Sequence, residues 1–229
     1  MAKKWRRQRA GYLAGLVSGL LVVAFLYLPE NERLHAPGPM NTGHENLKCA
    51  YCHRSAAGSL RQQLQAKARH VLGLRDHGAV LGLRPVGNEA CLSCHERPED
   101  SHPVFRFLEP KYTEAREKIR PHLCTSCHLE HTGRRATVAM TFCRHCHEDL
   151  KLRKDPVSIS HEQQVKKERW DLCLRCHDYH GNHRMKVEKK ILFSHDKTEI
   201  GRYLAGGTES PYSRHKRYKA RKKPPDEGA

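Results

Sequence analysis

The sequence is short of the residues from which protein interiors are usually built. Hydrophobic residues occupy 38% of its 229 positions and aromatic residues only 7%. No alternating pattern of the kind that marks a half-buried β-strand is present. Acidic residues are also scarce, 25 against 42 basic ones, and the formal net charge is +17. Such a composition alone favours disorder or nucleic-acid binding. However, 10 cysteines and 18 histidines argue against a disordered basic chain and indicate that metal or a cofactor fills the interior.

Much of the hydrophobic content lies near the N-terminus. An uncharged run from Gly11 to Leu28 follows a short basic segment without acids. The run is just long enough to span a bilayer as a helix, and its basic flank predicts a cytoplasmic N-terminus. We therefore expect a basic cytoplasmic segment over 1–9 and a transmembrane anchor over 10–28. A cleaved signal peptide is the alternative, but the residues before Pro29 lack its small-residue cleavage pattern.

One face of this run is lined by small residues. Gly11, Gly15 and Gly19 recur every four residues, the spacing that lets a second helix approach closely in a membrane. We therefore expect the anchor to contact another membrane protein.

All ten cysteines lie in five copies of one pattern, Cys-x-x-Cys-His. The cysteine pairs are Cys49 and Cys52, Cys91 and Cys94, Cys124 and Cys127, Cys143 and Cys146, and Cys173 and Cys176, and the histidines that follow them are His53, His95, His128, His147 and His177. This pattern attaches c-type haem, because its two thiols form thioethers with the porphyrin and its histidine binds the iron. Zinc ribbons use cysteine pairs two at a time, and a disulfide framework does not explain the histidines. The sequence therefore predicts five covalently bound c-type haems.

The motifs resemble those of the class III, cytochrome c3/c7-like multihaem c-type cytochromes in a membrane-anchored form, over residues 44–195. The chain is also similar to the NapC/NirT-type quinol dehydrogenases, which typically carry four motifs rather than five, and to the pentahaem subunit of alternative complex III. The resemblance implies an electron-transfer protein of the bacterial inner membrane with its haem domain on the periplasmic side.

Thirteen histidines remain after the five motif histidines, more than enough to give every iron a second, distal imidazole. His44 lies five residues before Cys49, where class III proteins often place a ligand to a neighbouring haem. A helix that begins with a capping box at Ser160 carries His161 on its apolar face. Two candidates, His131 and His180, each follow a motif histidine by three residues.

The fifth candidate, His102, lies among apolar residues that suit a porphyrin face. His195 has a similar setting, whereas His70 lies off the apolar face of its expected helix. Met40, Met140 or Met185 could replace one histidine and would raise the potential of that haem. The candidate distal ligands are therefore His44, His102, His131, His161 and His180.

The expected fold is mostly irregular with short α-helices: a multihaem cytochrome c domain of the class III kind behind one N-terminal transmembrane helix. Helices are expected near 60–72, 111–120 and 161–172. A linker over 29–43 precedes a pentahaem domain over 44–200, and a basic, flexible tail occupies 201–229. That tail suits an acidic redox partner or anionic lipid, and nucleic acid is not an expected ligand outside the cytoplasm.

These features predict an electron carrier rather than an enzyme. Electrons would pass between a quinol-linked membrane complex and a periplasmic partner, with the chain as one subunit of a larger assembly. Two alternatives stay open. One is a reductase in which a single haem keeps an open coordination position for a small nitrogen or sulfur species, and the other is a quinol dehydrogenase that works by itself.

Overall fold

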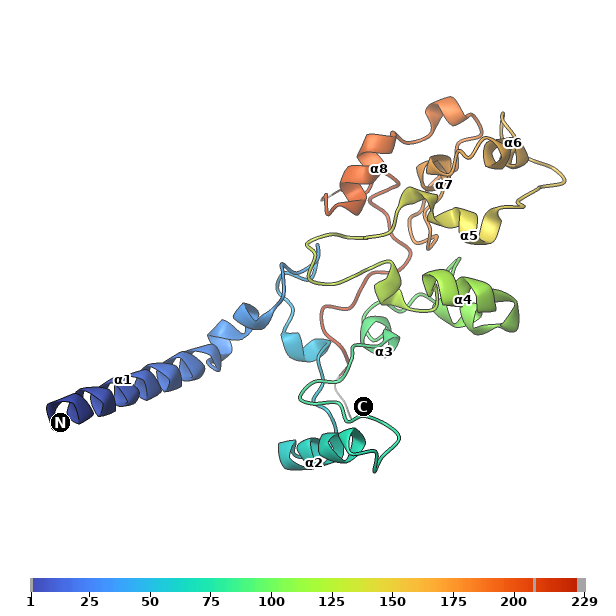
Figure 1. The fold of residues 1–229 in the computed structure, drawn as a ribbon. Helices are drawn as coiled ribbons and strands as arrows, with labels where there is room; N and C mark the ends of the chain where they lie inside the picture. Colours follow the sequence, from blue (N-terminus) through green and yellow to red (C-terminus); the bar gives the residue numbers. More distant parts are fainter. Residues whose placement is uncertain (1, 208, 226–229) are drawn as a thin grey trace. The chain divides into compact units, whose positions relative to one another are not determined.

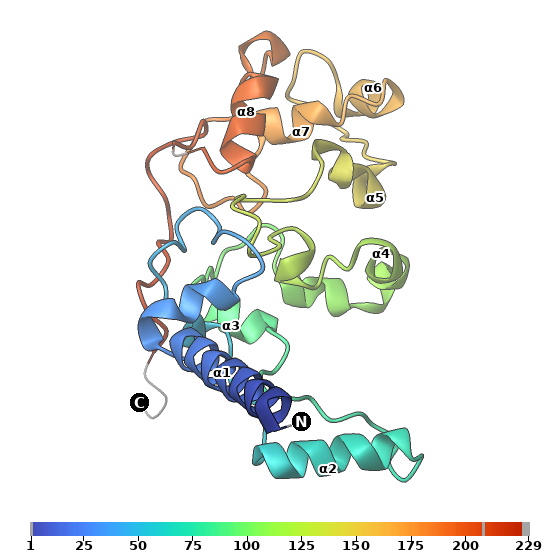
Figure 2. The same cartoon turned by 60° about the vertical axis from the view of Figure 1, so that its left-hand side comes forward.

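The computed structural model describes residues 2–207 and 209–225, and the chain divides into two compact units. The first unit runs to Pro39 and the second begins at Met40, so the division falls within the linker expected over 29–43. The ribbon is shown from two directions in Figures 1 and 2. All five Cys-x-x-Cys-His motifs belong to the second unit.

The first unit is built around one long helix, α1 (Ala2–Leu26). Its most apolar 18-residue stretch, within Trp5–Leu26, has a mean hydropathy of 1.8, so the helix is long and apolar enough to cross a bilayer, a property that signal sequences share. The 3-10 turn that follows, Pro29–His35, folds back on the helix end, where the ring of His35 donates to the carbonyl of Leu26 (2.8 Å). This contact satisfies one of the carbonyls that a helix end leaves without a partner.

The second unit is an irregular chain with short helices. Its described residues form no β-strand and only two isolated bridges. This arrangement confirms the expected fold class of short helices in an otherwise irregular domain, behind one apolar N-terminal helix. The helices of this unit are α2 (Leu60–Val71), α3 (Asn88–Leu92), α4 (Thr113–Ile119), α5 (Arg144–His147), α6 (His161–Lys166), α7 (Asp171–Cys176) and α8 (Lys197–Leu204).

Two of the three helices expected from the sequence form close to their expected positions. α2 begins after a capping box in which the amide oxygen of Gln62 accepts from the backbone N–H of Ser59 (2.8 Å). α4 continues from a 3-10 turn at Pro110–Tyr112 and stops at Arg120, whose φ of 48° is left-handed. The stop falls one residue before Pro121, which could not continue the helix.

The third expected helix, over 161–172, is wrong, because the chain forms α6 and α7 with a turn between them. Glu168 adopts a left-handed φ of 52°, and the next amide, that of Arg169, donates back to the carbonyl of Gln164 (2.9 Å). This backbone closure ends α6 without a glycine or proline to signal it. Leu172 therefore belongs to α7 and does not share a helix face with His161.

The apolar core is small for a unit of this size. The buried hydrophobic side chains among the described residues are Ala56, Phe107, Ala115, Ala136, Trp170, Leu172, Ile200 and Tyr212. The most deeply buried are Ile200 on α8 and Leu172 on α7, at 0% and 2% exposure, and these two helices pack against each other. The turn Met140–Cys143 also packs against α7. Because this turn ends at the first cysteine of the fourth motif and α7 carries the cysteines of the fifth, the two motifs are packed together.

The C-terminal segment differs from the free tail expected over 201–229. Residues 201–204 form the end of α8, and later residues pair with the rest of the unit through backbone hydrogen bonds. The amide of Arg217 donates to the carbonyl of Asn182 (2.8 Å), and that of Arg221 donates to Cys94 in the second motif (2.9 Å). The guanidinium of Arg221 also pairs with Glu96 (2.8 Å). Backbone pairing of this kind depends on tertiary position and leaves no mark in a basic sequence.

Because Ile200 is fully buried, replacing it should destabilise the domain. Ile200→Ala is expected to lower the free energy of unfolding by about 2–5 kcal/mol, through lost burial and the cavity left behind. Leu192→Ala, at a side chain that is 86% exposed, is the matched control and should change it by less than about 0.5 kcal/mol. Guanidinium unfolding followed by circular dichroism measures both. Equal effects would contradict the packing of α7 and α8 described here.

Candidate haem sites

Each cysteine motif folds as a tight turn that presents its histidine in a common way. In four of the five motifs the backbone N–H of the histidine donates to the carbonyl of the first cysteine, at 2.8–2.9 Å. In the fourth motif α5 itself carries the pattern. No disulfide joins any of the ten cysteines. Both thiols of each pair therefore remain available for thioether bonds beside the histidine.

Every motif histidine faces one other histidine ring. The sites are numbered here by the order of their motifs. The pairs, with the distances between ring centroids, are His53 with His131 at 6.1 Å (site one), His95 with His44 at 5.8 Å (site two), His128 with His180 at 6.1 Å (site three), His147 with His102 at 6.2 Å (site four) and His177 with His161 at 6.2 Å (site five).

This spacing tests whether the residues suit a haem iron. A metal–imidazole bond is about 2 Å long, and the ring centroid lies about 1 Å beyond the nitrogen, so two axial imidazoles place their centroids about 6 Å apart. All five pairs meet that requirement. The residues present therefore fit haem with histidine on both faces of the iron.

The partners of the five motif histidines are the same five that the sequence singles out as candidate distal ligands. The other histidines considered lie elsewhere. The ring of His195 packs edge-on against Tyr212 at 5.4 Å, and the ring of His70 donates from Nδ1 to the carbonyl of Arg75 (2.9 Å).

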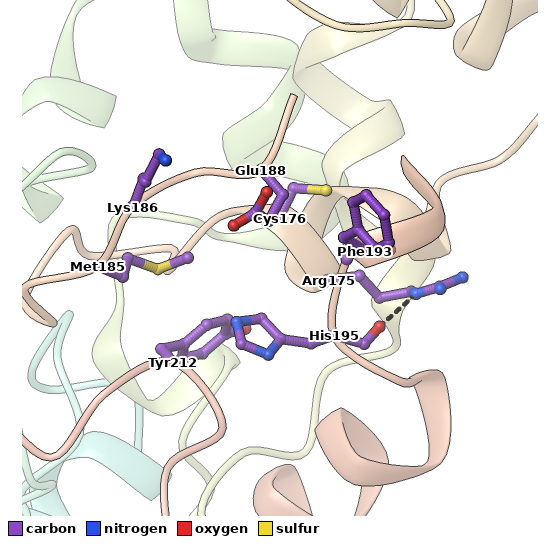
Figure 3. A pocket seen from close by; sticks show the side chains of 9 residues that line it. Arg175, Cys176, Met185, Lys186, Glu188, Phe193, His195 and Tyr212 are labelled. Atoms are coloured by element: carbon purple, nitrogen blue, oxygen red, sulfur yellow. Dashed lines mark hydrogen bonds between the residues drawn. The ribbon is translucent and has the colours of Figure 1, made fainter. Parts of the chain in front are cut away.

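His195 also lines a small pocket beside Cys176, the second thiol of the fifth motif. Figure 3 shows Met185, Phe193 and Tyr212 around the same space, with Arg175 hydrogen-bonded to the carbonyl of His195 (2.6 Å). The walls of the pocket are mixed, because the charged side chains of Lys186 and Glu188 line it as well. Met185 therefore lines the surroundings of site five, where His161 already faces the motif histidine.

The pairs cross between motifs. The distal histidine of site one follows the third motif, and that of site two precedes the first motif. The distal histidine of site three follows the fifth motif, and that of site four follows the second. The segments of the first, second, third and fifth motifs thus each contribute to two sites, so sites cannot be placed independently. Sequence reasoning named these histidines as candidates but did not predict the pairing.

Two asparagine-centred contacts, at the buried Asn41 and the half-buried Asn88, hold these crossings, and the sequence did not single them out. Asn41 is 4% exposed; its side chain donates to the carbonyl of Leu129 (2.9 Å) and accepts from the amide of Thr132 (3.1 Å). It thereby fastens the segment of His44 to the loop of His131. His131 needs such support, because its φ of 62° is left-handed and costs about 1–3 kcal/mol unless its surroundings fix it.

Asn88 makes the corresponding link between the second and third motifs. Its side chain donates to the carbonyl of His122 (2.6 Å) and accepts from the amide of Cys124 (2.9 Å). The thiols of Cys91 and Cys124 contact each other, and the contact raises the pKa of Cys91 while it lowers that of Cys124. The attachment points of sites two and three are therefore immediate neighbours.

A second thiol contact joins sites four and five. The Cys143 and Cys173 thiols interact, and the interaction raises the pKa of Cys173 and lowers that of Cys143. The turn Met140–Cys143, which leads into α5, packs against α7, so this neighbour relation is built into the packing.

Carboxylates orient three of the distal histidines. The Nδ1–H of His44 donates to Glu130 (2.7 Å), that of His161 to Asp155 (3.0 Å) and that of His180 to Asp100 (2.9 Å). A carboxylate on one ring nitrogen fixes the tautomer that leaves the other nitrogen to bind metal, and makes the ligand more electron-rich. His102 donates instead to a backbone carbonyl, that of Tyr179, at 2.7 Å. An acid six residues before His161 is a weak signal that could have pointed to Asp155. Asp100 lies 80 residues from His180, so no local pattern marks that contact.

Asp100 serves two sites. Besides holding His180, its carboxylate accepts from the backbone amide of His102 (2.8 Å) and pairs with Arg97 (3.2 Å). Burial would raise the pKa of Asp100, but the hydrogen bond and charge of His180, the amide and Arg97 outweigh burial and leave the pKa lowered. The carboxylate is thus charged at neutral pH and lies between the distal ligands of sites three and four.

Burial sets the protonation of several ligands. It lowers the pKa of His95 to about 4 and also lowers the pKa values of His128 and His177. His128 in addition donates from Nδ1 to the carbonyl of Arg135 (2.7 Å). Only a neutral imidazole binds metal, so these side chains are held in the ligating form at neutral pH.

Paired thiols followed by a histidine, with a second histidine opposite each one, define a multihaem c-type cytochrome. A comparison with protein families agrees: the family model described as cytochrome c3 matches residues 32–148, which is about half of the chain and contains the first four motifs. No curated protein and no solved structure matches. The chain belongs to the cytochrome c3 family, and it is a multihaem electron-transfer protein with covalently bound c-type haem.

The pairing at site five predicts a spin-state change. His161→Ala removes the imidazole opposite His177 and should convert one haem from low-spin to high-spin iron, because a five-coordinate iron with one histidine is high-spin. EPR of the oxidised protein measures this. The control is His195→Ala, at a histidine that faces Tyr212 instead, and it should leave all signals low-spin. A high-spin haem in the control and not in His161→Ala would reverse the assignment.

The carboxylate contact at site three predicts a change in potential. Asp100→Asn removes the charge next to His180, so the ligand donates less electron density and the ferrous iron is favoured. One haem should rise in potential by on the order of 60 mV, which corresponds to a tenfold change for a one-electron couple.

Spectroelectrochemical titration of the haem-containing protein measures this shift. Asp149→Asn makes the same charge change at an exposed position and should leave the titration curve in place. If both variants shift the curve alike, the effect is general electrostatics and not the contact with His180.

Proposed function

We propose that this cytochrome carries five haems, one at each motif, is anchored in the bacterial inner membrane by α1, and relays electrons between a quinol-linked membrane complex and a periplasmic partner. One observation carries the proposal: an imidazole lies about 6 Å from every motif histidine. Two imidazoles fill both axial positions of an iron, and an iron without an open position passes electrons and does not bind a substrate. This arrangement supports a relay over a reductase.

The contacts between sites support a linear path. Site one meets site two where Glu130, next to His131 in the chain, holds His44. Sites two and three meet at the Cys91 and Cys124 thiols, and sites four and five meet at Cys143 and Cys173. Sites three and four meet at Asp100, whose carboxylate accepts from the ring of His180 and from the backbone amide of His102. Neighbours in space therefore follow the order of the motifs along the chain.

When bound, each haem supplies an iron that alternates between the ferric and ferrous states. The chain's own contribution is the ligand set and its surroundings. Histidine on both faces holds the potential below that of a methionine-ligated haem. Carboxylates behind His44, His161 and His180 favour the ferric state further, whereas the carbonyl behind His102 does so less. Because the hydrogen-bond acceptor of the distal histidine differs from site to site, the haems of the relay have unequal reduction potentials.

Membrane attachment is supported by the length and apolarity of α1 and by the basic residues at its N-terminal end. Open space surrounds the positions where side chains would project from Gly11, Gly15 and Gly19, so this face can accept a closely packed helix of a partner. The exposed basic side chains of the C-terminal segment, such as Lys219 and Lys222, are suited to an acidic partner or to anionic lipid.

Three measurements on protein purified from membranes test the proposal together. A pyridine haemochrome assay should give five haems per chain, intact mass should show a retained N-terminus, and EPR of the oxidised protein should contain only low-spin signals. A count below five would remove a site, a shortened N-terminus would replace the anchor by a signal peptide, and a native high-spin haem would favour the reductase.

A further inference from the structure

The helix α2 is amphipathic, but the side that it turns toward the rest of the chain is polar. Gln63 is only 7% exposed. Its amide donates to the carbonyls of Ala56 (3.2 Å) and Gly58 (2.9 Å), and its side-chain oxygen accepts from the amide of Gly82 (2.9 Å). These hydrogen bonds, and not apolar packing, attach the helix to the two segments at its base.

The apolar side of the same helix is exposed. Leu60, Leu64 and Val71 are 65%, 52% and 74% exposed, and spacings of four and seven residues place them on one face. Leu72 and Leu74, at 70% and 73% exposure, extend this patch beyond the helix end. A contiguous set of large apolar side chains facing outward marks an interaction surface, unlike a single exposed leucine.

The patch lies in an excursion of the chain, residues 54–84, whose two ends pair with each other. The bridge between Ser55 and Leu83 and the hydrogen bond from the amide of Arg84 to the carbonyl of Arg54 (2.8 Å) close its base. Both views show α2 at the margin of the second unit (Figures 1 and 2). The excursion thus presents its exposed face as one fixed element.

The net charge of this excursion indicates which kind of surface its apolar patch can bind. Residues 54–84 contain six basic side chains and a single acid, Asp76, a net charge of +5 with histidines neutral. Arg61 and Lys67 each lie three residues from Leu64, so they flank the apolar face. A helix with an apolar face and basic flanks lies in the interface of an anionic membrane, with its apolar side chains in the acyl boundary and its cations among the headgroups.

We propose that α2 and the loop after it, over residues 60–74, bind the surface of an anionic lipid bilayer. The inference rests on the proposed anchoring of the chain by α1, which keeps the haem domain next to a membrane. A second contact on the same chain then forms at a high effective concentration. Two points of attachment restrict the orientation of the haem domain, which one flexible linker cannot do.

The full-length haem protein carrying Leu64→Cys tests this contact. Its ten native cysteines are consumed as thioethers, so the new thiol alone reacts with a water-soluble maleimide, and intact mass gives the rate. The protein is placed in lipid nanodiscs of phosphatidylcholine alone or with phosphatidylglycerol. Gln65→Cys is the matched control, one residue along the helix and exposed but off the apolar face.

The thiol at position 64 should react at least tenfold more slowly in the discs with phosphatidylglycerol than in the neutral discs, and the thiol at position 65 should change less than twofold. Adding Arg61→Gln and Lys67→Gln to Leu64→Cys should abolish the difference between the discs. This combination supports the proposal, because protection then depends on both the apolar face and its basic flanks.

Equal rates at position 64 in both kinds of disc would overturn the proposal. Slow reaction in both would do so too, since the face would then be covered by the chain or its haem. Size-exclusion chromatography of the same samples separates these results from failure of the anchor. Elution apart from the discs would overturn the proposed anchor together with this inference, whereas co-elution with equal rates overturns the inference alone.

Discussion

The opposition of two histidine rings about 6 Å apart is the constraint on which the rest of the second unit depends. Four of the five pairs join segments that are far apart in the sequence, and apart from hydrogen bonds such as those of Asn41 and Asn88 little apolar packing joins them. The buried apolar side chains cluster mainly near α7 and α8, where Ile200 and Leu172 lie. A core of that size does not fix a chain with no described β-strand. Iron bound between each pair would supply the missing cross-links, and in such proteins the free energy of metal binding becomes free energy of folding.

Around the paired rings lies a layer of polar contacts that sets their chemistry. Burial keeps motif histidines such as His95 neutral, and carboxylates hold distal ones such as His44 and His180. The same contacts also connect sites: Asp100 touches elements of two, and Asn88 ties the second motif to the third. Structure and potential are therefore set by the same residues. A change in one of these polar side chains affects the geometry of a ligand and the electron affinity of its iron together.

Local chemistry made much of this site readable from the sequence. The thioether motif needs its residues at fixed short spacing, so all fifteen motif residues stand out, and the helix at 60–72 was marked by the capping residues Ser59 and Gln62. What could not be read depends on long-range geometry. Which histidine faces which motif is decided by how the chain crosses itself. The end of α6 at Glu168 is a backbone closure without a marker residue, and Arg221 is held through its main chain.

The crossing of ligands between motifs has a consequence for biogenesis. A chain emerging from its N-terminus presents both histidines of site two once His95 is exposed, although the first motif precedes it. Site one waits for His131, site four is complete at His147, and site five at His177. Site three, in the middle of the series, is the last to receive its full ligand set, at His180. The middle site is thus completed last, and a truncated chain without the last fifty residues would lack the histidine that faces His128.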